Sequence, residues 1–154
     1  MLDPLSFIGS LSSIVSLLDC CTKVAVFIST YLKEAQEVHE IVRYLGDEIK
    51  QLQNGLETIY ETLGNMTEIR STRFRDALKE AVDDCASKLN ALTALLQQIQ
   101  DSKTKIGAKY RYDINLPKIQ RHIQSIDRCR QSFLLCLTQI NVYSPLHPLR
   151  RLSN

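Results

Sequence analysis

Hydrophobic residues recur every three or four positions over most of the chain, which is the spacing of one face of an α-helix. The clearest run lies between residues 38 and 63, where charged side chains occupy many of the intervening positions. Its apolar stripe consists of Val38, Val42, Leu45, Ile49, Leu52, Leu56, Ile59 and Leu63. This spacing predicts one amphipathic helix of about seven turns. The dipeptide Gly64-Asn65 that follows predicts a helix stop in the left-handed conformation.

Two later segments have the same period. A helix expected to begin at Ser71 or Thr72 and to end near Asp101 has the stripe Phe74, Leu78, Ala81, Cys85, Leu89, Leu92, Leu96 and Ile99. Asn115 and Pro117 are the residue types favoured just before a helix and at its first position, so they predict the start of the last helix. Its stripe is Ile119, Ile123, Ile126, Phe133, Leu137 and Ile140. The basic, aperiodic residues 102–115 between these two helices are predicted to be an exposed connection.

The first segment differs because its apolar residues point in nearly every direction. One stripe between residues 5 and 32 is Leu11, Ile14, Leu18, Cys21, Ala25 and Ile28, and another is Phe7, Leu17, Val24, Phe27 and Tyr31. A helix that is apolar nearly all round is either buried centrally or made for lipid. We therefore expect this helix to be packed on more sides than the other three.

These four segments predict an all-α fold, a four-helix bundle of long antiparallel helices with a hydrophobic N-terminal helix. A chain of 154 residues is long enough to bury about 70% of its unfolded surface as one domain. We place that domain at residues 1–143. Residues 144–154 contain two prolines and no period, so they are interpreted as a tail or as the start of a linker to a downstream region.

Residues 4–18 carry no charge, which raises the question of a membrane segment. A signal peptide begins with positive charge, whereas the only charged side chain before this run is Asp3. A resident transmembrane helix needs about 18 to 20 apolar residues, so this run of fifteen, which includes five serines, is too short and too polar. Two alternatives stay open: a core helix of the bundle, which the residues alone favour, or a core helix that also enters membranes.

Charge is unevenly distributed along the chain although the net charge is only +2. Residues 34–63 hold seven acidic side chains against two basic ones, and residues 103–130 hold eight basic against two acidic. Attraction between two neighbouring helices is the favoured explanation, and a binding site for an anionic partner is the other. The isoelectric point of about 8.3 is below the range of dedicated nucleic-acid binders, so no nucleic-acid partner is expected.

Residue patterns for catalysis or cofactor binding are missing from the sequence. The glycine-rich phosphate-binding motifs do not occur, and His39, His122 and His147 have no second ligand at metal-binding spacing. Five cysteines, an odd number without a CxxC pair, are typical of small hydrophobic side chains in a reducing compartment. We therefore expect no enzyme activity, no catalytic residues, no cofactor and no metal.

The opening "LDPLSFIGSLSSIVSLLDCCTKVAVFISTYLKEAQEVHEIVRYLGDEIKQL" resembles the start of the fungal HeLo-like N-terminal domains. Those domains begin with an xDPLS segment, followed by a hydrophobic helix and a helix with spaced leucines. The later stretches "LNALTALLQQIQ" and "KTKIGAKYRYDINLPKIQRHIQSIDRCRQSFLLCLTQ" are similar to the family's later helix, basic connection and final helix. The resemblance covers nearly the whole chain, although the family's Trp-Pro-Phe-like entry to the last helix is replaced by Tyr112 to Pro117.

This resemblance implies a cell-death execution domain of a fungal NLR-like receptor or a prion-controlled effector, similar to the four-helix bundles of necroptotic pseudokinases. Such a domain would rest in the cytoplasm, self-associate on activation and permeabilise the plasma membrane, under control of a downstream receptor or amyloid-motif region. The first helix would insert through Leu5, Phe7, Ile8, Leu11, Ile14, Val15, Leu17 and Leu18. The basic connection would first dock on anionic membrane lipids through Lys103, Lys105, Lys109 and Arg111. The alternative is a soluble oligomerisation or regulatory module without membrane activity.

Overall fold

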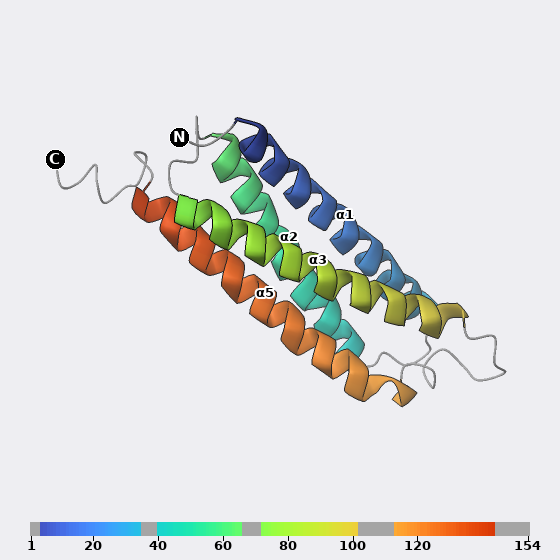
Figure 1. Ribbon diagram of the computed structural model, residues 1–154. Helices are drawn as coiled ribbons and strands as arrows, with labels where there is room; N and C mark the ends of the chain where they lie inside the picture. The colour runs from blue at the N-terminus through green and yellow to red at the C-terminus, as the bar shows by residue number, and fades with distance from the viewer. Residues whose placement is uncertain (1–3, 35–39, 66–71, 102–112, 144–154) are drawn as a thin grey trace.

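The computed structural model describes residues 4–34, 40–65, 72–101 and 113–143, with side chains for residues 11–33, 40–65, 73–101 and 113–138. Four long helices make up the architecture: α1 (Pro4–Glu34), α2 (Glu40–Gly64), α3 (Thr72–Asp101) and α5 (Leu116–Tyr143). All regular structure within these ranges is helical, and Figure 1 shows the helices packed lengthwise. The prediction of an all-α four-helix bundle with a hydrophobic N-terminal helix is therefore confirmed.

Each helix runs in the opposite direction to the one before it in the chain (Figure 1). The close-packed pairs are α1 with α2, α2 with α5, α1 with α3, and α3 with α5. Consecutive helices α2 and α3 thus lie diagonally across the bundle. Because of this diagonal step, the neighbours α1 and α3 run parallel, and so do α2 and α5 (Figure 1).

The predicted stripes of the three later helices lie in the core, together with buried residues of α1. In α2, every described member of the stripe is buried, from Val42 to Leu63. In α3 the stripe is buried except for the half-buried Ala81, and in α5 it is buried from Ile119 to Phe133. Val38 and the side chain of Ile140 lie outside the described residues. Burial of this continuous apolar surface stabilises the bundle, at about 1.5–3 kcal/mol for each large side chain.

The position of α1 differs from the expectation. It has two close neighbours, α2 and α3, as many as every other helix in the bundle, so the prediction that it is packed on more sides is wrong. Its buried residues come alternately from the two predicted stripes: Ile14, Leu17, Cys21, Val24, Ile28 and Tyr31. A corner position needs only one apolar face, so the packing does not account for the apolar character of the rest of α1.

The start of α5 and the end of α2 can be compared with the start and stop signals predicted from the sequence. The backbone N–H of Ile119 donates to the carbonyl of Asn115 over 3.0 Å, so the first α5 turn begins where Asn115 and Pro117 predicted. At the end of α2, the N–H of Asn65 donates to the carbonyl of Glu61 over 3.1 Å. No described residue has a positive φ, so the left-handed stop predicted at Gly64-Asn65 is wrong, because the helical hydrogen bonding simply extends into Asn65.

Candidate functional site

The predicted membrane-insertion residues of α1 do not share one surface. Ile14 and Leu17 are buried in the bundle core at 0% and 2% exposure, whereas Val15 on the opposite side is 42% exposed. Leu11 and Leu18 are half-buried at the edges between these two faces. The side chains of Leu5, Phe7 and Ile8 lie outside the described residues. Insertion through the whole set would therefore require α1 to turn its core face outward.

The outer face of α1 combines exposed valines with hydroxyl side chains. Val26 is 59% exposed, one of the largest exposures of an apolar residue in the described part of the chain. The hydroxyls of Ser16, Thr22 and Thr30 donate to backbone carbonyls one turn earlier, over 3.2, 3.0 and 2.9 Å. Such hydroxyls already have a partner within their own helix, which lowers the cost of moving them out of water.

The apolar stretch Leu11–Lys33 of α1 is long and apolar enough to cross a membrane, and among the described residues no other helix meets this criterion. Only 28% of the most apolar part of this stretch is buried inside the bundle. The stretch passes Asp19 and Lys23 and extends well beyond the uncharged run that ends at Leu18. Length and composition are the whole of this criterion, and the core helix of a soluble protein also meets it.

The predicted lipid-docking residues Lys103, Lys105, Lys109 and Arg111 lie outside the described residues. Their segment connects the C-terminal end of α3 to the start of α5. The insertion and docking residues of the prediction are therefore not brought together by any contact that the structure describes.

A buried ion pair between α2 and α5 was not predicted from the sequence. The Glu48 side chain is only 5% exposed, and its Oε2 lies 3.7 Å from Nε of Arg130. Arg130 in turn donates from Nη2 to Oδ1 of Asp127 over 2.6 Å. Glu48 raises the pKa of the Tyr44 phenol by its negative charge and by a hydrogen bond. The sequence did contain a signal for the burial of Glu48. This residue follows Leu45 by three positions and precedes Leu52 by four, which is the spacing of the buried stripe of α2.

This ion pair bears on the two explanations for the uneven charge. The acidic segment lies on α2, part of the basic segment lies on α5, and these helices are neighbours as the favoured explanation required. Arg130 is the basic residue that contacts α2 through Glu48. Arg43, by contrast, pairs within its own helix with Glu40 over 3.8 Å.

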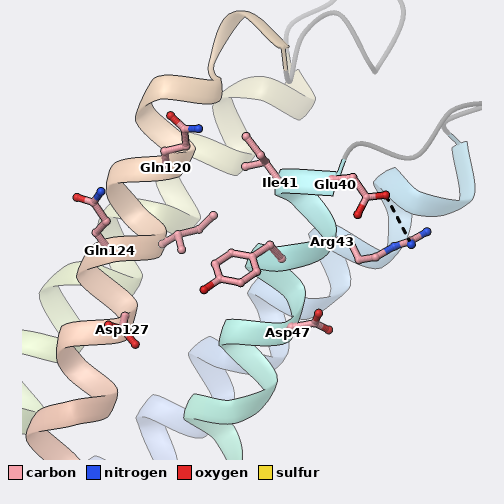
Figure 2. A pocket seen from close by; sticks show the side chains of 9 residues that line it. Glu40, Ile41, Arg43, Asp47, Gln120, Gln124 and Asp127 are labelled. Carbon is pink, nitrogen blue, oxygen red and sulfur yellow. Dashed lines mark ion pairs between the residues drawn. The ribbon is translucent and has the colours of Figure 1, made fainter.

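A surface groove of about 720 Å³ runs along the α2/α5 seam near the start of both helices. Its lining includes Ile41, Tyr44 and Ile123 together with polar residues of both helices. In Figure 2, Glu40, Arg43 and Asp47 extend away from α5 rather than converging on the groove. The groove therefore presents no array of polar groups aimed at one point, which a catalytic or metal site would require.

Three cysteines from three helices meet in the core. Burial, together with the charges of Cys20 and Cys129, raises the pKa of Cys21 to about 12. A hydrogen bond to Cys129, followed by burial, raises the pKa of Cys85. The Asp84 carboxylate lies 3.9 Å from the Cys129 sulfur. All five cysteines are free, and within the described ranges no group of three ligand side chains could hold a metal ion.

His122 lies half-buried on the α3 side of α5, and its pKa is lowered by burial and by the positive charges of Arg121 and Lys88. His39 and His147 lie outside the described residues. Lys88 belongs to α3 and Arg121 to α5, so both helices contribute positive charge near His122.

Comparison with known proteins adds no relative: no family model, no curated protein and no solved structure matches this chain.

Proposed function

We propose that this chain is a membrane-permeabilising domain of the HeLo-like kind, which executes cell death when α1 leaves the bundle and enters a lipid bilayer. The observation that carries this proposal is the outer face of α1, which is apolar beyond what its corner position requires. Val15 and Val26 are exposed there, and the neighbouring hydroxyls of Ser16 and Thr22 are satisfied within the helix.

The energetics favour release into lipid over release into water. Detaching α1 uncovers the six buried side chains of its core face. At about 1.5–3 kcal/mol each, exposing them to water costs of the order of 10 kcal/mol, as much as the whole stability of a typical domain. A bilayer covers the same apolar surface again, so release is coupled to membrane contact.

The polar contacts of α1 also favour its release. Its described buried residues carry no charge, so no buried ion pair has to be broken when it leaves. Its hydrogen bonds to the neighbouring helices include a bond from Gln53 to Thr22 over 3.4 Å and one from the Cys20 thiol to Asn90 over 4.0 Å. Both distances are at the long end for such bonds, so they contribute little to holding α1 in place.

The remaining parts of the proposal concern recruitment. Lys103, Lys105, Lys109 and Arg111 would attract the anionic cytoplasmic leaflet at about 1 kcal/mol each. Self-association would then present several α1 helices to the same patch of plasma membrane, under control of a region downstream of residue 154. At rest the domain would stay in the cytoplasm with the core face of α1 covered.

Dye release from anionic phospholipid vesicles tests the proposal with a matched pair of double variants. Val15→Glu with Val26→Glu places two charges on the exposed face of α1, and Tyr60→Glu with Leu134→Glu places two charges at exposed apolar positions of α2 and α5. All four positions are exposed, so both variants should keep the helical content of the wild type. We expect the α1 variant to lose at least about tenfold in leakage rate, because each buried charge in lipid costs several kcal/mol, and the control variant to leak as the wild type does.

Equal leakage by the two double variants would contradict insertion through α1. Absence of leakage by the wild type, even when it is clustered on the vesicles through a C-terminal affinity tag, would contradict membrane permeabilisation altogether. In that case the alternative of a soluble regulatory module would hold. Circular dichroism of each variant shows that a loss of leakage does not come from unfolding.

A further inference from the structure

The outer surface of the α3/α5 pair has two halves of opposite charge. At one end, a groove of about 810 Å³ is lined by the carboxylates of Asp76, Glu80, Asp83 and Asp84, with Lys79 as the one basic side chain in its lining. Leu135 of α5, which is 67% exposed, lies in the same groove. We call these residues the acidic half of the α3/α5 face.

The other half of this face is basic. It comprises Lys88 on α3 and three residues of α5, because Lys118 and Arg128 lie three and seven residues from Arg121 and so share its face of the helix. The positive charges of Arg121 on α5 and Lys88 on α3 both lower the pKa of His122, so Lys88 lies near this imidazole across the α3/α5 seam. The pKa of His122 is lowered by burial as well, so this imidazole stays neutral at neutral pH and the four longer side chains carry the charge.

The register of the two antiparallel helices keeps the far ends of these halves apart within one chain, whereas Arg128, next to Cys129, and Lys88, one turn from Asp84, lie near their boundary. The contact between Asp84 and Cys129 fixes which residues of α3 and α5 are level with each other. Arg121 lies eight residues before Cys129 in α5, which is about 12 Å further along the helix. In the described part of the chain, none of Glu80, Asp83, Lys118, Arg121 or Arg128 forms an ion pair.

We propose that the α3/α5 face is a self-complementary interface through which two copies of this chain pair about a two-fold axis. An axis that lies in the interface and perpendicular to the line between the two halves places each acidic half against the partner's basic half. Pairing of the same patch on both subunits is the commonest geometry of protein oligomers. Guanidinium groups of the partner would then enter the acidic groove, where carboxylates accept their paired hydrogen bonds.

Charge complementarity identifies a second copy as the occupant of this face. A membrane or a nucleic acid is negative throughout, so it would match the basic half and be repelled by the acidic half. A second copy presents four basic residues to the acidic half and four acidic residues to the basic half at the same time. This pairing supplies the self-association on which the proposed function rests, but it takes place in solution and needs no lipid.

Sedimentation equilibrium of the full chain at low salt tests the pairing with complementary charge reversals. One variant carries Glu80→Lys and Asp83→Lys, which reverses two of the four charges of its acidic half, and the other carries Lys118→Glu and Arg121→Glu, which reverses two of the four charges of its basic half. We expect the wild type to dimerise and to dissociate as salt is raised. Each variant alone should have a dissociation constant at least about tenfold higher, and an equimolar mixture of the two should form a heterodimer.

Matched controls reverse equal charge elsewhere. Glu57→Lys with Glu61→Lys on α2, and Lys33→Glu with Lys50→Glu on α1 and α2, change exposed residues outside the α3/α5 face, so both should dimerise as the wild type does. A wild type that stays monomeric at low salt, or a mixture of the two reversed variants that stays monomeric, would overturn the proposal. Because no lipid is present, a failure of α1 to permeabilise vesicles leaves these results unaffected.

Discussion

Helices α1 and α2 occupy equivalent corners of the bundle, yet their outward faces differ. Each has two close neighbours and each buries a stripe of large apolar side chains. The outward face of α2 carries charged residues such as Asp47 and Glu57 beside the phenols of Tyr44 and Tyr60, whereas that of α1 carries Val15 and Val26 between small hydroxyl residues. The same packing requirement has thus been met by two different sequences. The extra apolar character of α1 is therefore not needed for the packing of the bundle, and it is the observation behind the proposed membrane role.

The inward faces differ as well. Glu48 of α2 is the one buried charged residue among those the structure describes, and its ion pair ties α2 to Arg130 of α5. The inward face of α1 holds only uncharged side chains. A helix that pairs a buried charge with its neighbour cannot leave without exposing that charge to an apolar medium, which is costly. The proposed release of α1 would therefore break no buried ion pair among the described residues, whereas release of α2 would break the one between Glu48 and Arg130.

The largest predicted effect concerns what the two helices have in common. Ile14→Ala in α1 and Leu56→Ala in α2 each remove a fully buried side chain, at 0% exposure in both cases. Each should lower the free energy of unfolding by about 2–5 kcal/mol, from lost burial and the cavity left behind. Urea denaturation measures both. A loss below about 1 kcal/mol for Ile14→Ala alone would show that α1 is not part of the cooperative core, and the equivalence of the two corners would be wrong.

The sequence predicted the fold well because the apolar period of three helices matches the buried residues, for example at Val42, Leu45 and Ile49. It could not choose between the two stripes of α1, since a helix that is apolar nearly all round gives no preferred side. The diagonal placement of α2 and α3 could not be predicted from the sequence either, because helical periodicity indicates which face is buried but not which neighbouring helix covers it. Within the candidate site, helical spacing alone separates Ile14 from Val15 around α1, but it could not say which of the two is buried.

For the charged residues, the sequence likewise indicated which helices would be neighbours but not which residues would form a pair. Composition indicated that an acidic and a basic helix would lie side by side, and α2 and α5 do. Which residues form the contact depends on helix register, which placed Glu48 opposite Arg130. The groove of the acidic half is likewise lined by residues about fifty positions apart, such as Glu80 of α3 and Ser132 of α5, that only the antiparallel packing brings together.

A smaller effect is predicted for the ion pair that distinguishes the inward faces. Arg130→Ala leaves the Glu48 carboxylate buried without its partner, so the unfolding free energy should fall by about 2 kcal/mol, less than for a fully buried pair because Arg130 is 29% exposed. Glu48→Leu should cost less, since Arg130 keeps Asp127 over 2.6 Å and an apolar side chain suits the site. Thermal and urea unfolding of both variants check the order. The reverse order would show that the pair does not hold α2 against α5.

The smallest predicted effect concerns the hydroxyls on the two outward faces. Ser16 in α1 and Thr58 in α2 each donate to the carbonyl one turn earlier, over 3.2 and 2.9 Å. Because these bonds are local, Ser16→Ala and Thr58→Ala should both change the unfolding free energy by less than about 0.5 kcal/mol. Dye release by the Ser16→Ala variant should stay within about twofold of the wild type, since a hydroxyl already bonded inside its own helix gains no new partner in lipid. Loss of leakage in Ser16→Ala without loss of stability would instead mean that this hydroxyl makes a contact in the membrane-bound state. Membrane insertion of α1 would then depend on this polar contact as well as on the apolar surface of its outer face.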